Sequence, residues 1–113
     1  MIAHVVLFKP KPELTAAQRE AVLGDLKAAA SGIPTVRRLR VGRRIRHGRP
    51  GYEQLMREDF EYVVIIEFDD VDGLAAYLAH PQHAAIGSHF MQSAAAALAY
   101  DYEMEDWSPG QRG

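Results

Sequence analysis

The segment "FEYVVIIEF", Phe60 to Phe68, constrains the fold more than any other part of the chain. It is short and rich in β-branched and aromatic residues, which is typical of a β-strand. Apolar residues occupy successive positions from Val63 to Ile66, so both faces of the strand carry them. We therefore predict a strand at the centre of a sheet whose two faces both need cover.

Shorter signals predict the elements before this strand. A first strand over Ile2 to Phe8 stops at "KPKP", because proline cannot continue a hydrogen-bonded ladder. A helix follows, with Thr15 and Gln18 in capping-box spacing, an apolar face, and an end at Gly32. A second strand alternates Leu39, Val41 and Ile45 with arginines, and the polar segment 48–59 is then a long hairpin loop.

The part after the central strand predicts two helical segments and a last strand. The carboxylates of Asp69, Asp70 and Asp72 favour a helix N-terminus, and Pro81 ends that helix and opens another. The alanine run at 94–97 favours helix, so the final strand is predicted from "LAYDYEMEDW" onward. The expected order is strand, helix, strand, strand, helix pair, strand.

This order predicts an α+β fold, a ferredoxin-like split βαβ with a four-stranded antiparallel sheet and its helices on one face. The other face remains uncovered, and we expect a second subunit to cover it, which makes a homodimer. The length of 113 residues suits a single domain with one core, here residues 1–107, followed by a tail at 108–113.

Composition excludes several classes of partner. The formal net charge of -2 does not fit a nucleic-acid-binding protein, and no apolar run is long enough for a membrane span or a secretory signal. The chain has no cysteine, which removes disulfides and thiolate chemistry and fits a cytoplasmic location. The arginine run at 37–49 is the one local basic feature, and we interpret it as a solvated strand face and hairpin rather than an anion site.

The segment "YLAHPQH" is the main candidate for chemistry. Tyr77 and His80 share a helix face by their spacing, and His83 lies one turn beyond Pro81. An imidazole that titrates near neutral pH, paired with a phenol, can move protons on a ketone-bearing substrate. The alternative is a helix junction that His80 caps and beneath which His83 packs. The spacing does not fit a zinc site, so we expect no metal.

These features together resemble the stress-responsive A/B barrel (Dabb) family. The resemblance runs from Ile2 to about Asp106 and rests on "HVVLFK", "IP", "EF", "YLAHPQH" and "YDYE". It implies a dimeric α/β barrel in which two four-stranded sheets close on each other. One plant member of the family is a polyketide cyclase that closes a linear tetraketide thioester by an aldol reaction without cofactor or metal.

The resemblance also implies residue roles. His83 would be the general base, Tyr77 its partner that positions a carbonyl, and Asp101 the carboxylate that orients the catalytic imidazole. His4 and Tyr62 would line the substrate pocket, and His80 with Pro81 would be structural. Tyr62 departs from a histidine of that cyclase, and Leu26 departs from a pocket tyrosine.

Three functions follow from the resemblance. The first is a homodimer that binds a small carbonyl-bearing or polyketide-like ligand and acts on it as a cyclase or lyase, without cofactor. The second is a non-enzymatic stress-responsive or ligand-binding protein. The third is a cofactor-independent monooxygenase, as found elsewhere among dimeric α/β barrels.

Overall fold

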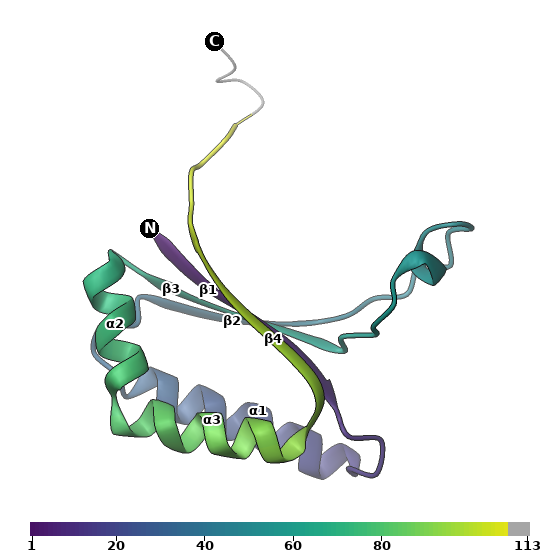
Figure 1. The fold of residues 1–113 in the computed structure, drawn as a ribbon, viewed down its shortest axis with the longest axis horizontal. Helices are drawn as coiled ribbons and strands as arrows, with labels where there is room; N and C mark the ends of the chain where they lie inside the picture. The colour runs from purple at the N-terminus through teal and green to yellow at the C-terminus, as the bar shows by residue number, and fades with distance from the viewer. Residues whose placement is uncertain (109–113) are drawn as a thin grey trace.

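The computed structural model describes residues 1–108 and has one four-stranded antiparallel sheet in the order β2-β3-β1-β4. The elements along the chain are β1 (Ile2–Pro10), α1 (Ala16–Ser31), β2 (Arg38–Arg43), the short 3-10 helix η1 (Glu53–Leu55), β3 (Tyr62–Phe68), α2 (Val71–Ala79), α3 (Pro81–Ser93) and β4 (Ala94–Glu103). The three α-helices lie on one side of the sheet (Figure 1). The predicted α+β, ferredoxin-like fold is confirmed.

The first helix forms where local signals place it. The Thr15 side chain accepts a hydrogen bond from the Gln18 backbone N–H, and the Gln18 side chain accepts one from the Thr15 N–H. This capping box satisfies two N–H groups that the first turn would otherwise leave unpaired. Helix α1 then buries Val22 and Leu26 against the sheet and ends at Gly32.

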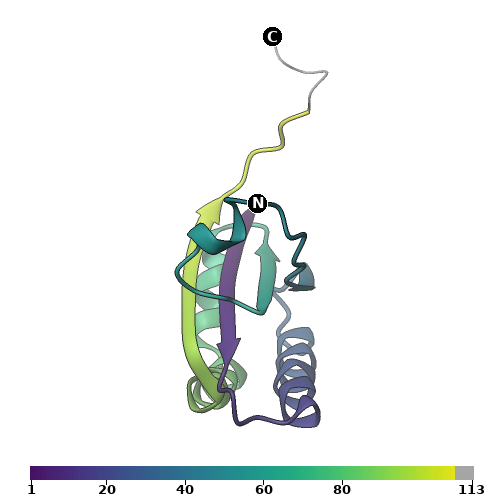
Figure 2. The same ribbon diagram turned by 90° about the vertical axis from the view of Figure 1, so that its right-hand side faces the viewer.

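The core lies between the helices and the inner face of the two central strands. Phe8 on β1 and Val64, Ile66 and Phe68 on β3 are almost completely buried there. Alternate residues of β3, such as Val63 and Ile65, point to the opposite face and are only partly buried. In Figure 2 the strands β4 (yellow-green), β1 (purple) and β3 (teal) run side by side. Strand β3 is central, as its sequence predicts.

Strand β4 begins earlier than the sequence predicts. The alanine run favours helix, yet Ala94–Ala97 belong to β4, and Ala96 and Ala97 pair with Lys9 and Phe8 of β1. The small side chain of alanine is compatible with both a helix and a strand. The unpaired backbone groups at the edge of β1 therefore determine that this segment forms a strand, because they offer hydrogen-bond partners.

Strand β2 is shorter than predicted. Its last pair joins Arg43 to Tyr62, and Ile45, expected on the strand, lies beyond it and is 78% exposed. The two chain segments leave the sheet together as an arm that carries η1 (Figure 1). The predicted loop at 48–59 is therefore a projecting hairpin with arginine-carboxylate pairs at its base, such as Arg44 with Asp59 at 2.7 Å.

None of the helices within residues 1–108 has the length and apolar character needed to cross a lipid bilayer. The last five residues of the expected tail, 109–113, lie outside the described residues, and Ser108 has no regular secondary structure.

Candidate active site

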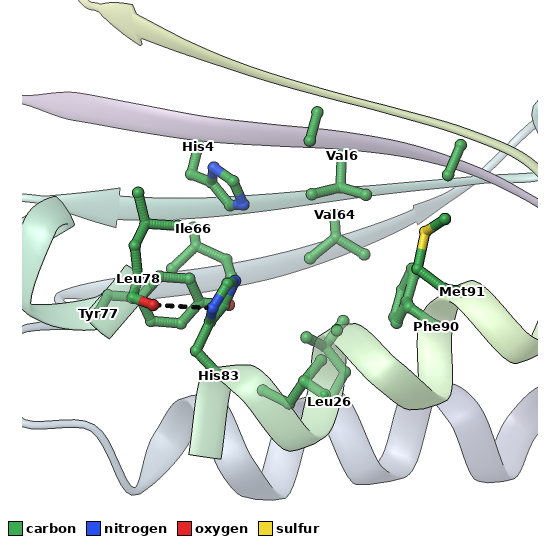
Figure 3. A pocket seen from close by; sticks show the side chains of 14 residues that line it. His4, Val6, Leu26, Val64, Ile66, Tyr77, Leu78, His83, Phe90 and Met91 are labelled. Atoms are coloured by element: carbon green, nitrogen blue, oxygen red, sulfur yellow. Dashed lines mark hydrogen bonds between the residues drawn. The ribbon is translucent and has the colours of Figure 1, made fainter. Parts of the chain in front are cut away.

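An apolar cavity of about 280 Å³ lies between the sheet and the helices. Three strands and three helices contribute to its wall: His4, Val6, Leu26, Val64, Ile66, Tyr77, Leu78, His83, Ile86, Gly87, Phe90, Met91, Ala97 and Ala99. Most of these residues are apolar, and Figure 3 shows polar groups gathered at one end, with Phe90 and Met91 at the other.

Three rings from different elements form the polar end. His4 extends from β1, Tyr77 from α2 and His83 from the first turn of α3 (Figure 3). The Tyr77 ring packs near both imidazoles, with centroid distances of 5.8 Å to His4 and 4.8 Å to His83. The three groups lie together at one end of the cavity (Figure 3), although His4 and His83 are 79 positions apart in the sequence.

The junction between α2 and α3 places His83 at this position. His80 ends α2 and caps α3, and its Nδ1 accepts a hydrogen bond from the Gln82 N–H at 3.1 Å. Pro81 occupies the first turn of α3, where a missing N–H costs nothing. His80 is not among the cavity residues, so of the two histidines around Pro81 only His83 reaches the cavity.

The hydrogen bond of His83 determines which of its ring nitrogens can accept a proton. Its Nδ1 lies 3.1 Å from the carbonyl oxygen of Leu78, and since a carbonyl only accepts, Nδ1 carries the proton. In the neutral ring Nε2 then keeps a free lone pair. Burial lowers the pKa of His83 below its ordinary value of 6.5, and the nearby His4 lowers it further, against a raising effect of the Leu78 carbonyl. The ring is therefore neutral at pH 7 and able to accept a proton.

Tyr77 has the complementary property. Its residue is only 2% exposed, and burial raises its pKa to about 12. A phenol with this pKa stays protonated at neutral pH and can donate a hydrogen bond to a carbonyl or enolate oxygen. A neutral base and a neutral acid thus stand side by side in a mostly apolar site.

Asp101 pairs with His4 rather than with His83. The two residues are directly opposite in the β1–β4 register, and Nδ1 of His4 is 2.5 Å from Oδ1 of Asp101. His83 has its Nδ1 engaged by Leu78, on the far side of the cavity from β4. The expected Asp101 contact to the base is thus replaced by a contact to the other imidazole, because strand register determines the partner of Asp101.

Tyr62 does not line the cavity. It is 6% exposed and packs beside Phe8, with 6.2 Å between ring centroids, while the Arg43 guanidinium lies 5.5 Å from its ring. Tyr62 and Val64 both point to the helix side of β3, but Tyr62 lies two residues farther than Val64 from the strand position opposite His4. Leu26, which the resemblance places at a pocket position, does line the cavity.

Sequence reasoning missed most of the apolar wall. His83, Ile86, Gly87 and Phe90 follow the three-and-four spacing of one helix face, so that period could have identified them. Ala97 lies on β4, where the helical interpretation of the alanine run concealed it, and Ala99 lies on the predicted final strand but was not identified as a cavity residue.

The other candidate sites have structural explanations. Within residues 1–108 no group of three or more His, Cys, Asp or Glu side chains is arranged to hold a metal ion. Asp70 caps α2 through the Gly73 N–H at 2.8 Å. Arginines of the basic run pair with carboxylates, as Arg37 does with Asp69 and Arg43 with Glu20, both at 2.7 Å.

Comparison with known proteins places the chain among small barrel proteins. Residues 2–104 match the family model described as "Stress responsive A/B Barrel Domain". The chain is 23% identical to olivetolic acid cyclase from Cannabis sativa over 101 residues, which cover 89% of this chain and 94% of that protein.

Solved structures share the fold. A hydroxynitrile lyase from Passiflora edulis has a TM-score of 0.79 at 16% identity, with 96% of each chain covered. A dimeric ferredoxin-like protein from Thermobifida fusca has a TM-score of 0.72 at 24% identity, with 91% of this chain and 90% of that chain covered.

Proposed function

The chain belongs to the stress responsive A/B barrel (Dabb) domain family, and on that basis we propose that it binds a small carbonyl-bearing ligand in the cavity and transfers protons on it. One observation carries this proposal: the neutral imidazole of His83 and the neutral phenol of Tyr77 lie 4.8 Å apart, ring to ring, at the polar end of an apolar cavity. The resemblance to olivetolic acid cyclase supports the same chemistry.

The proposed first step is removal of a proton from the carbon next to a carbonyl. Nε2 of His83 takes the proton, and the electron pair of the C–H bond moves to the carbonyl oxygen as an enolate. The Tyr77 hydroxyl donates a hydrogen bond to that oxygen, and such donors are most effective where water is excluded. In a cyclase the enolate carbon then bonds to a second carbonyl carbon of the same molecule. The new alkoxide recovers the proton from the His83 imidazolium.

Roles for the remaining polar residues follow from their contacts. Asp101 accepts the Nδ1–H of His4 and so directs the other nitrogen of that imidazole toward the ligand. We assign His4 to ligand binding and Asp101 to its orientation. His80 and Pro81 shape the helix junction that presents His83. No step uses a metal or an organic cofactor.

The cavity also suggests the form of the ligand. Ligand pockets of roughly 300–1,000 Å³ hold drug-sized molecules, so about 280 Å³ suits a small one. Phe90 and Met91 line the end away from the imidazoles (Figure 3), which favours a ligand with a carbonyl head and an aliphatic or aromatic remainder. A polyketide-like compound has this form.

We further propose that the protein is a homodimer. The outer face of the sheet carries partly buried Val5, Leu7, Val63 and Ile65, and no helix within residues 1–108 covers it. Apolar surface of this kind marks an interaction site. The dimeric protein from Thermobifida fusca shares the fold. Light scattering at micromolar concentration should give twice the chain mass of 12.6 kDa, and a single chain mass would overturn this part of the proposal.

Deuterium exchange tests the proton transfer without knowledge of the natural substrate. A medium-chain methyl ketone in D2O should exchange its α-protons faster with the protein than without it, as followed by proton NMR. His83→Ala should abolish the acceleration. His89→Ala is the matched control, because His89 lies on the same helix but outside the cavity. No acceleration with any ketone that binds would instead support the non-enzymatic ligand-binding alternative, and oxygen uptake with phenols that requires His83 would support the monooxygenase alternative.

A further inference from the structure

The projecting arm between β2 and β3 (Figure 1) carries a concave surface that the proposed function does not use. A pocket of about 540 Å³ is lined there by His47, Arg49 and Tyr52. None of the three residues lines the cavity between the sheet and the helices. All three side chains carry hydrogen-bond donors, and within residues 1–108 no carboxylate contributes to this wall. The surface therefore has the donors that an anion requires.

Arg49 provides the positive charge of this pocket. Other arginines of the basic run are paired with carboxylates, as Arg44 and Arg46 are with Asp59. Arg49 is exposed, and it makes no ion pair with any of the residues that the structure describes. Its planar set of N–H donors can therefore bind two oxygens of a ligand through parallel hydrogen bonds.

A backbone contact determines which ring nitrogen of His47 can donate. Its Nδ1 accepts a hydrogen bond from the Arg49 backbone N–H at 3.1 Å, so the neutral ring carries its proton on Nε2. The Nε2–H group is then the one that can donate to a ligand. Tyr52 packs its ring edge-on to this imidazole, with centroids 5.2 Å apart. The imidazole and the phenol thus support each other in the wall of one pocket.

The carboxylate of Glu53 is bound by the backbone of the arm. It accepts hydrogen bonds from the N–H groups of His47 and Gly48, at 2.5 Å and 3.1 Å. The Gly48 bond, aided by that from His47, holds the pKa of Glu53 below its ordinary 4.5. Its contact with the His47 ring is longer, at 3.5 Å from Nδ1. The one carboxylate beside the pocket is therefore already satisfied by N–H donors.

Two glycines shape the tip of the arm. Gly48 and Gly51 have φ values of 70° and 71°, in the left-handed region where a side chain is strained. The chain turns at both positions, and Arg49 and Tyr52 are thereby brought to one pocket. The pocket therefore depends on the backbone shape of the tip as well as on its side chains.

We propose that this pocket binds a small phosphate monoester, whose phosphate group is held by Arg49, His47 and Tyr52. A phosphate monoester has three acceptor oxygens and more than one negative charge at neutral pH, which matches a guanidinium and two further donors. A phosphate group alone is much smaller than the pocket of about 540 Å³. The organic part of the ester then lies against the ring of Tyr52, which is 57% exposed.

Titration with phenyl phosphate tests the site in the full chain. Protein labelled with nitrogen-15 is titrated at constant ionic strength, and the side-chain signals of His47 and Arg49 are followed by NMR. Both should shift along one binding curve. Arg49→Gln should weaken binding about tenfold, since a charge-assisted contact is lost. Arg57→Gln is the matched control, because it removes the same charge from the same arm outside the pocket, and it should keep the affinity.

A second variant separates a shaped site from simple attraction of charges. Gly51→Ala keeps every charge of the arm but is strained at this φ, so it should also weaken binding. Equal weakening in Arg49→Gln and Arg57→Gln, or full affinity in Gly51→Ala, would overturn the proposal. Binding to vesicles of phosphatidic acid without binding of phenyl phosphate would overturn the assignment to a small molecule.

Discussion

The imidazole of His4 and the carboxylate of Asp101 lie directly opposite on β1 and β4, with Nδ1 of His4 2.5 Å from Oδ1 of Asp101. His4 is 7% exposed, and its ring also contacts Tyr77. The carboxylate accepts the Nδ1–H and so selects one tautomer of a buried ring. Asp101, near the end of the chain, thus determines which ring nitrogen of His4, near its start, carries the proton.

Asp101→Asn should disturb this tautomer without unfolding the protein. An amide is a weaker acceptor than a carboxylate and can present its NH2 group instead, so the ring loses its single preferred tautomer. Nitrogen-15 chemical shifts of the His4 imidazole should move from one tautomer toward a mixture. Asp25→Asn removes the exposed partner of His89 and should leave the His4 shifts unchanged. An unaltered His4 spectrum in Asp101→Asn would contradict the assigned role.

His83 should make stability depend on pH in the acidic range. Burial lowers its pKa in the folded state below the ordinary 6.5, so below that pH the unfolded chain binds the proton more readily. The free energy of unfolding should therefore fall as the pH drops through about 6.5 and level off below the folded-state pKa. His83→Gln should flatten this decrease, as measured by urea denaturation at a series of pH values.

The free energies of unfolding of the unmodified protein and of His83→Gln should also be compared at higher pH. At pH 8 the ring of His83 is neutral in both states, so the difference between the two proteins there reports packing alone. A His83→Gln protein that loses stability in acid as steeply as the unmodified one would show that His83 does not contribute.

Tyr77→Phe should separate binding from stability. The ring and its contacts with Phe68 and His83 remain, while a hydroxyl in an apolar setting is removed. We expect little change in melting temperature and a loss of ketone affinity of about 2- to 10-fold, the net value of one hydrogen bond. Tyr102→Phe, on the outer face, should keep the affinity. Equal affinity in both variants would exclude Tyr77 as the carbonyl donor.

Gly87→Ala should stabilise the fold and narrow the cavity. A Cβ at Gly87 meets nothing within 4 Å, and alanine in a helix interior is favoured over glycine by about 0.5–1 kcal/mol. Gly24→Ala in α1 has equally open space but lies away from the cavity. Both variants should unfold at higher urea concentration, and only Gly87→Ala should weaken the binding of longer ketones. Weakened binding in both would indicate a general effect of helix stiffness.

Local physical chemistry made much of the fold predictable from sequence. The Thr15 capping box, the ladder stop at "KPKP", the division of the helices at Pro81 and the alternation in β3 each act within a few residues, so they can be read without a partner. The same holds for His80, whose capping contact is two residues away. The apolar residues on both faces of β3 also predicted that a second layer covers the sheet.

What only the tertiary structure decided were contacts between residues far apart in the chain. Strand register, not spacing, placed Asp101 opposite His4 rather than beside His83. The register also places Tyr62 opposite Phe8, outside the cavity, and pairs the alanine run with β1 as part of β4. These outcomes depend on which backbone groups find partners across the sheet, and a weakly biased segment takes whichever structure satisfies them. The sequence by itself determined the elements and the residue types of the site, and the pairing of strands determined which side chains meet.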